Sequence, residues 1–134
     1  MEPSSSLNYV VAFIQPFQLE GVVDALRLVP GCPGMSVSEV RGVGCTGAHP
    51  PREGERTEVD PFEKKVRIEV FCLAADVPGI VDAIRAAAHT GNPGDGKVFV
   101  GPVTAAYRIR TAESGARAVT PCPSDKEFEN ERCT

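Results

Sequence analysis

The chain has 134 residues, of which 42% are hydrophobic, and it carries a formal net charge of −4 at pH 7. A chain of this length accommodates one domain with one hydrophobic core. Because the sequence has no basic block and only 6% aromatic residues, it lacks the charge pattern of a nucleic-acid-binding protein. We also expect no membrane insertion and a cytoplasmic location, since no apolar run is long enough to span a bilayer and no basic leader is present.

Five cysteines occur at irregular spacing and without a C-x-x-C pair. An odd number of cysteines is unlike the disulfide framework of a small secreted domain, so a reducing compartment is expected. Structural zinc sites usually contain closely spaced cysteine pairs, so we predict no metal site.

The first part of the chain is predicted to form a strand, a helix and a second strand. Residues 1–7 are expected to be a flexible lead-in, and residues 8–14 are apolar on both faces of a strand, which requires cover on both faces. Apolar residues then recur at helical spacing at Leu19, Val22, Val23 and Leu26. Residues 35–41 alternate at first, and the break at Glu39 and Val40 predicts a bulge or an exposed edge.

The second part repeats this order after a long gap. Residues 43–61 show no periodicity, which is typical of a functional or flexible loop, whereas residues 65–73 alternate strictly and place Cys72 in the core. The signals of a second helix are Asp76 as N-cap, the apolar residues Val77, Ile80, Val81, Ile84 and Ala87, His89 in the last turn and Gly91 just past the end. Residues 97–110 are predicted to form one long or two short strands, and residues 120–134 a flexible tail.

The segment TGNPGDGKVFV, at residues 90–100, has Gly or Pro at four of its first seven positions. Glycines let backbone N–H groups approach an anion closely, and Lys97 adds a positive charge, so this segment is a candidate phosphate cradle. It fits the pattern G-x-x-x-x-G-K, but Val98 replaces the hydroxyl residue that would bind Mg²⁺, and the helix precedes the loop, which argues against a Walker-type hydrolase. The alternative interpretation is a glycine-terminated helix that turns into a strand.

The order strand, helix, strand, long loop, strand, helix, strand predicts an α+β fold of the ferredoxin-like βαββαβ type. In this fold an antiparallel sheet carries both helices on one face, so the other face is bare. Because the first strand is apolar on that face as well, we expect the chain to oligomerise through it.

Five segments together resemble the PII nitrogen-regulatory signal-transduction proteins. They are VVAFIQPFQLEGVVDAL, GMSVSEVRGVG, KKVRIEVFC, HTGNPGDGKVFVGPV and YRIRTAESG, and the resemblance extends over residues 8–119. It implies a regulator that forms a homotrimer of ferredoxin-like subunits and binds ATP or ADP, or AMP, in clefts between subunits. The loop at residues 43–61 would dock on a transporter or an enzyme.

The resemblance also implies the residues that bind the nucleotide. Around the phosphates these are Gly94, Asp95, Gly96, Lys97, Arg108 and Arg110, and around the adenine they are Ser36, Glu69 and Phe71. From the residues alone, Arg108 and Arg110 lie two positions apart on one face of a strand, so they can reach one anion together. The alternative interpretation of these arginines is a solvated strand edge.

The base of the long loop departs from the family pattern. It reads GVGCTG, with Cys45 and Thr46 where the family has an arginine and a glutamine that helps to hold Mg²⁺ and 2-oxoglutarate. Threonine reaches less far and has no side-chain carbonyl, so a response to 2-oxoglutarate, to another anion or to neither stays open. Lys65 matches the family's carboxylate-binding lysine, and with the backbone amides from Gly44 to Thr46 it suits a small oxyanion such as bicarbonate. Many relatives are uridylylated at a loop tyrosine, but this chain has Glu58 there, so that modification is not expected.

Two alternatives accompany this regulatory function. One is a sensor of carbon metabolism, associated with carboxysomes, that responds to bicarbonate together with ADP or AMP. The other is a slow ATP-hydrolysing enzyme, although no nucleophile with an adjacent base is evident and no catalytic residue is predicted. Cys122 and Cys133 in the tail are a candidate redox pair, which a reducing cell would keep open.

Overall fold

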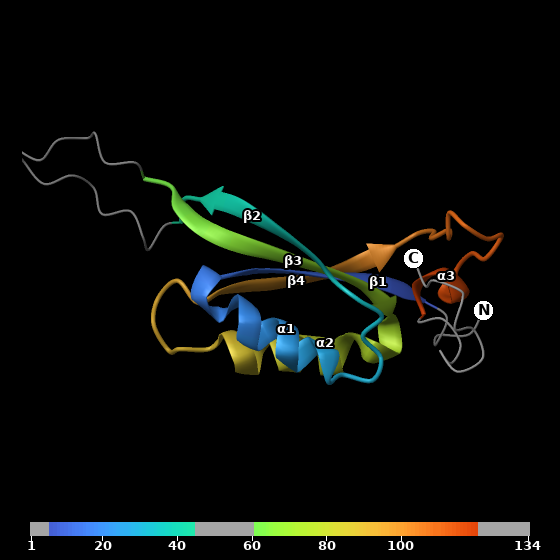
Figure 1. Ribbon diagram of the computed structural model, residues 1–134, viewed down its shortest axis with the longest axis horizontal. Coiled ribbons are helices and arrows are strands. Elements are labelled where there is room, and N and C mark those ends of the chain that lie inside the picture. Colours follow the sequence, from blue (N-terminus) through green and yellow to red (C-terminus); the bar gives the residue numbers. More distant parts are fainter. Residues whose placement is uncertain (1–5, 45–60, 121–134) are drawn as a thin grey trace, which may run out of the picture.

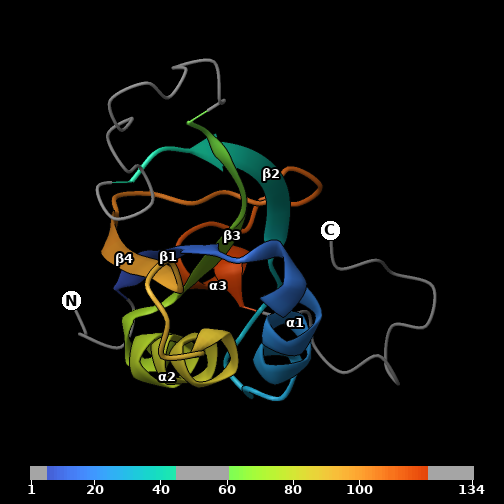
Figure 2. The same ribbon diagram turned by 90° about the vertical axis from the view of Figure 1, so that its left-hand side faces the viewer.

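The computed structural model describes residues 6–44 and 61–120, and it has the predicted ferredoxin-like α+β fold. Four strands form one antiparallel sheet in the order β2-β3-β1-β4. Helices α1 and α2 lie side by side on one face of this sheet (Figure 1; Figure 2). The elements are β1 (Leu7–Ile14), η2 (Pro16–Gln18), α1 (Leu19–Arg27), β2 (Ser36–Gly42), β3 (Glu63–Leu73), η3 (Ala74–Asp76), α2 (Val77–Ala88), β4 (Gly96–Val103) and α3 (Ala116–Val119).

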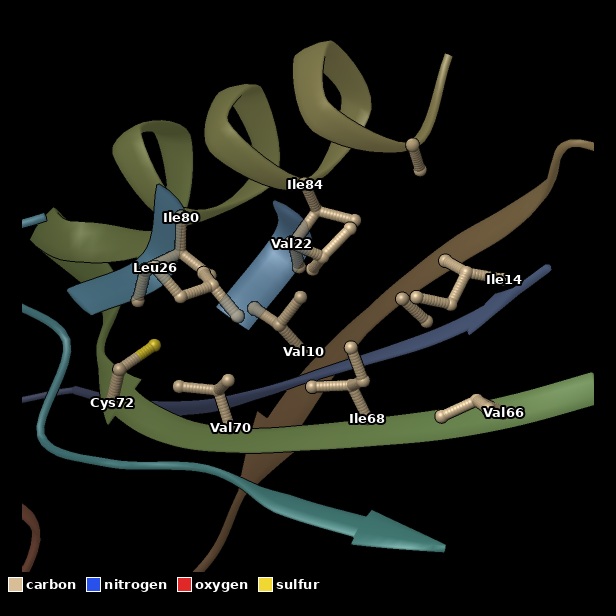
Figure 3. Packing of buried hydrophobic residues seen from close by; sticks show 12 residues of the cluster. Val10, Ile14, Val22, Leu26, Val66, Ile68, Val70, Cys72, Ile80 and Ile84 are labelled. Atoms are coloured by element: carbon tan, nitrogen blue, oxygen red, sulfur yellow. The ribbon is translucent and has the colours of Figure 1, made fainter. Parts of the chain in front are cut away.

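Aliphatic side chains fill the space between the sheet and the two helices (Figure 3). The strict alternation of β3 is confirmed, because every second side chain from Val66 to Cys72 points into this core. The other fully buried members are Val10, Ala12 and Ile14 of β1, Val22 and Leu26 of α1, and Ile80 and Ile84 of α2. Cys72 is completely buried, and burial raises the pKa of its thiol to about 11, so it is a neutral core residue as predicted.

The opposite face of the sheet is covered by neither α1 nor α2 (Figure 1). On this face Phe13 of β1 and Phe99 of β4 form an edge-to-face pair with ring centroids 6.2 Å apart. Phe99 is still 50% exposed, and Phe71 of β3 is 46% exposed. The first strand is therefore apolar on both faces as predicted, and one chain alone leaves much of the second face in water.

The strand pairing confirms one of the two alternatives predicted for residues 35–41, the exposed edge, and corrects one other strand prediction. β2 pairs with β3 without interruption from Ser36 to Gly42, so the break in the pattern at Glu39 marks an edge strand and not a bulge. The strand predicted to reach residue 110 ends at Val103, because Val103 pairs with Leu7, the first residue of β1. Beyond this point the chain has only an isolated antiparallel bridge between Tyr107 and Ser114 before the short helix α3, which the sequence did not predict.

The predicted ends of α2 are also adjusted. Asp76 occupies the N-cap position, but its side chain makes no capping hydrogen bond, because it is the last residue of the 3-10 turn η3 and already has helical backbone angles. His89 follows the last turn and is extended, so it does not lie within that turn. Gly91 has the expected positive φ of 89°.

Residues 1–5, 45–60 and 121–134 lie outside the described residues. The predictions for most of the lead-in, for most of the loop at 43–61 and for the tail fall there. They include Cys45, Thr46, Glu58, Cys122 and Cys133. Within the described part, no helix is long and apolar enough to cross a bilayer.

Candidate functional site

A cleft of about 830 Å³ opens where the glycine loop meets the ends of the strands. Because β1 runs antiparallel to β3 and β4, its end lies beside the beginnings of both, and the end of β2 lies beside the beginning of β3. The volume is typical of a small-molecule site. The predicted site residues that the cleft contains are Gly44, Lys65, Gly94, Asp95, Gly96 and Lys97.

The backbone of the glycine loop adopts angles that favour glycine. The φ values are 96° at Gly94 and 112° at Gly96, where β4 begins. Gly96 also lies directly against β1, since a Cβ built on it would be 1.8 Å from the carbonyl oxygen of Phe13. A positive φ and a close backbone approach therefore both require glycine at position 96.

The side chain of Asp95 forms hydrogen bonds with other residues of the same loop. Its carboxylate accepts hydrogen bonds from the backbone N–H of Thr90 at 2.7 Å, from the backbone N–H of Gly91 at 2.9 Å and from the Thr90 hydroxyl. These bonds, first of all the one from the Thr90 hydroxyl, hold the pKa of Asp95 below its ordinary value. The Asp95 carboxylate thus holds the conformation of the loop, and its partner Thr90 is a residue of the candidate site that the sequence did not single out.

Two side chains hold the loop at Gly94, one from Gln15, directly after β1, and one from Lys65 in β3. The Gln15 amide donates to the Gly94 carbonyl oxygen at 2.8 Å, and the Lys65 ammonium donates to the same oxygen at 2.9 Å. Gln15 was not predicted, because a single polar residue at the end of a strand carries no signal of its own. Its role follows from the pairing of Ile14 with Gly96, which brings the end of β1 to the loop.

The cleft has one more positive than negative side chain in its lining. Its charged lining residues are Arg41, Lys65 and Lys97, against Glu63 and Asp95. The Arg41 guanidinium lies over the ring of Phe62 at 5.5 Å, and the Lys65 ammonium is 3.8 Å from the Glu63 carboxylate. Lys97 forms no hydrogen bond or ion pair with any residue that the structure describes. A free ammonium beside backbone amides of a glycine loop can bind an anion, and phosphate in particular.

Arg108 and Arg110 lie at the other end of the sheet, in the segment between β4 and α3 (Figure 1). The expectation that both share one face of a strand is wrong, because β4 ends at Val103. The Arg108 side chain is only 9% exposed and pairs with Glu113 at 2.9 Å, whereas Arg110 is exposed. Neither arginine lines the cleft of its own chain.

The three residues predicted to surround adenine also lie away from the cleft. Ser36 pairs with Glu69 across β2 and β3, so both face the open side of the sheet, with Phe71 two residues further along. The Glu69 carboxylate is 3.4 Å from the Arg67 guanidinium on the same face. The predicted nucleotide residues of one chain therefore form two separate groups.

Comparison with known proteins identifies the family of this chain and the class of its fold. The sequence model of the family described as "Nitrogen regulatory protein P-II" matches residues 7–113. The Nitrogen regulatory protein P-II of Azospirillum brasilense is 42% identical over 113 residues, which are 84% of this chain and 100% of the relative. Nitrogen regulatory protein P-II 2 of Methanothermobacter thermautotrophicus is 42% identical over 114 residues, 84% of this chain and 97% of the relative.

Two solved structures agree with these sequences. Arabidopsis thaliana PII bound to citrate superposes with a TM-score of 0.71 at 31% identity, covering 92% of this chain and 99% of that one. The B. subtilis GlnK-ATP complex has the same fold, with a TM-score of 0.69 at 24% identity over 86% of this chain and 99% of the other. Fold and sequence together define a signal-transduction regulator with a ferredoxin-like domain. The chain belongs to the nitrogen regulatory protein P-II family, as the resemblance in the sequence indicated.

Proposed function

We propose that this protein is a regulator that binds an adenine nucleotide between two subunits of a homotrimer. The phosphates would rest on the amides of residues 94–97 and on the Lys97 ammonium. The bound nucleotide would set the conformation of the loop at residues 43–61, and this loop would control a partner enzyme or transporter. A ligand can act in this way only if it binds one loop conformation more tightly than another.

The separation of the predicted residues into two groups is the observation that carries this proposal. One group surrounds the glycine loop, and the other lies on the open sheet face and in the segment after β4. One chain cannot bring both groups to one nucleotide, whereas two adjacent copies can place the second group of one against the first group of the other. The exposed apolar face around Phe71 and Phe99 gives these copies a surface to bury.

The chemistry of the cleft suits a polyphosphate. Lys97 is free among the described residues, and the Asp95 carboxylate is already used by Thr90 and Gly91. A phosphate at the loop therefore meets an unpaired cation and an acidic group whose oxygens already accept hydrogen bonds. Charge-assisted hydrogen bonds of this kind contribute roughly 1.5–3 kcal/mol each, which is about a tenfold to hundredfold change in affinity.

Titration of the full chain with ATP, ADP and AMP by calorimetry tests this proposal, with Lys97→Ala as the site variant. We expect this variant to bind ATP at least tenfold more weakly than the natural chain. Lys64→Ala is the matched control, because Lys64 is an exposed lysine of β3 outside the cleft. Equal weakening in both variants would show that the effect is one of net charge and not of the site.

We further propose that Lys65 holds a second, small anion beside the nucleotide. Citrate, the ligand of the Arabidopsis relative, is a carboxylate, and the Lys65 ammonium lies in the same cleft as the glycine loop. An anion there would replace the Gly94 carbonyl as the partner of Lys65. Titrating the nucleotide-bound protein with bicarbonate and, separately, with 2-oxoglutarate would identify this effector. If the protein functions in carbon metabolism, bicarbonate should give a binding signal in this titration. The variant Lys65→Ala should abolish that signal.

A further inference from the structure

The side chain of Arg108 connects several residues of the segment after β4. Its Nη2 donates to the carbonyl oxygen of Arg117 at 2.8 Å and to that of Thr120 at 3.1 Å. Its Nε is 2.9 Å from the Glu113 carboxylate, and its backbone N–H donates to the Glu113 carbonyl at 3.0 Å. We call these contacts of Arg108 with Glu113, Arg117 and Thr120 the Arg108 clasp.

The clasp occupies the side of the guanidinium that an oxyanion prefers. A phosphate or carboxylate binds arginine bidentately through two parallel N–H groups. In the clasp Nη2 donates to two carbonyl oxygens, and Nε lies 2.9 Å from the Glu113 carboxylate as an ion pair, without the geometry of a hydrogen bond. Glu113 therefore holds the position that a phosphate oxygen would take.

The Glu113 carboxylate is itself fixed in place. The Thr111 hydroxyl donates to its Oε1 at 3.0 Å, and the Arg117 guanidinium is 3.6 Å from its Oε2. Arg110, by contrast, is exposed and forms no hydrogen bond or ion pair with a residue that the structure describes. The two arginines of the RIRT sequence thus differ: the Arg108 side chain contacts residues of its own chain, whereas the Arg110 side chain is exposed.

We propose that Glu113 is an internal competitor of the nucleotide phosphate for Arg108. This inference rests on the proposed nucleotide function. Arg110 makes the first contact with the phosphate of a neighbouring cleft, and Arg108 joins it only when it leaves Glu113. Its departure removes the donor from the carbonyl groups of Arg117 and Thr120, so nucleotide binding loosens the segment that contains α3.

Through this coupling the nucleotide affects a second region of the protein, besides the loop at residues 43–61. Helix α3 has only four residues, which is too short to be stable without contacts from outside the helix. The Arg108 clasp provides two of these contacts at its carboxyl end. Release of the clasp therefore changes the surface at residues 111–120 in response to the nucleotide.

Calorimetric titration of ATP into Glu113→Gln tests the competition. Glutamine keeps the shape of glutamate but not its charge, so we expect ATP to bind roughly threefold to tenfold more tightly than to the natural chain. The matched control is Glu20→Gln, which removes one negative charge from the surface of α1. Unchanged or weaker binding by Glu113→Gln would overturn the proposal.

Hydrogen exchange provides a second readout that does not depend on affinity. We expect Glu113→Gln to speed exchange at the amides of Gly115, Ala118 and Thr120, which donate within this segment. ATP should speed exchange at the same amides in the natural chain, and protection by ATP would contradict the proposal. If the natural chain bound no ATP, the proposed function would fail and the competition with it. ATP binding without a gain in Glu113→Gln would remove the competition alone.

Discussion

Replacement of Gly96 by alanine perturbs the junction between the glycine loop and β4. The added Cβ would lie 1.8 Å from the carbonyl oxygen of Phe13, whereas real Cβ atoms essentially never approach closer than 3.0 Å. The two strands would have to separate locally by at least 1.2 Å, the difference between these distances. The obstructing atoms belong to the backbone of β1, so no rotation of a side chain can relieve the clash.

Two effects contribute to the expected loss of stability. Alanine at a φ of 112° is strained, and insertion of an atom into a packed contact is destabilising. Each costs on the order of 1–3 kcal/mol, so Gly96→Ala should lower the free energy of unfolding by about 2–6 kcal/mol. Because the strain lies within the phosphate loop, we also expect ATP affinity to fall in any folded fraction of the variant.

Urea unfolding monitored by circular dichroism measures this change against two other glycine variants. In Gly101→Ala the new Cβ would be 2.3 Å from the Tyr9 hydroxyl and 2.4 Å from the nearest ring carbon, so the Tyr9 side chain would have to rotate, but none of the three nearest atoms belongs to the backbone and a smaller loss is expected. In Gly21→Ala the new Cβ meets no atom within 4 Å in α1, so we expect a gain of up to roughly 1 kcal/mol. A Gly96→Ala protein as stable as the natural chain would refute the reasoning.

Three further predictions concern the loop and the core. Asp95→Asn should speed amide hydrogen exchange at Thr90 and Gly91, because the amide cannot accept on both sides. In the natural chain the Asp95 carboxylate protects these two amides from exchange. Because the pKa of Asp95 is lowered, this protection should be complete above the ordinary pKa of 3.8 and lost as the pH falls through the lowered pKa. Ile84→Ala should lower the free energy of unfolding by about 2–5 kcal/mol in the same urea assay, since Ile84 is 1% exposed, and a smaller loss would contradict its place in the core. Cys72, whose pKa is raised to about 11, should resist alkylation by iodoacetamide at pH 8 in the folded protein and react in urea, and rapid reaction of the folded chain would contradict its burial.

The sequence predicted the elements whose periodicity is set by burial on one face. β3 and α2 are examples, because each has one face in the core and shows that face in its pattern of apolar residues. The end of β4 was not predictable in this way. The sequence Tyr107 to Arg110 alternates like a strand, but β1 begins at Leu7 and offers no partner beyond Val103. The extent of a strand depends on its neighbour, which local sequence does not record.

The residues of the candidate site were likewise predictable only in part. The glycine loop and Lys65 were found from a motif and a family resemblance, and the structure brings them into one cleft. Gln15 and Thr90 were missed, since the hydrogen bonds that each forms with the glycine loop depend on the fold and leave no pattern in the sequence. Arg108 was assigned to a strand, whereas its contacts with Glu113 and the carbonyls near α3 form across an irregular segment without periodicity.

The most direct test of the account uses two variants that each lack one half of the site. Lys97→Ala removes the cation at the glycine loop, and Arg110→Ala removes a cation at the other end of the sheet. Each variant alone should bind ATP weakly. If the variants are denatured, mixed and refolded together, some clefts will combine Lys97 from one copy with Arg110 from another, and calorimetry should show that tight ATP binding returns in a fraction of the clefts. Mixed protein that binds no better than either variant alone would contradict a site shared between subunits.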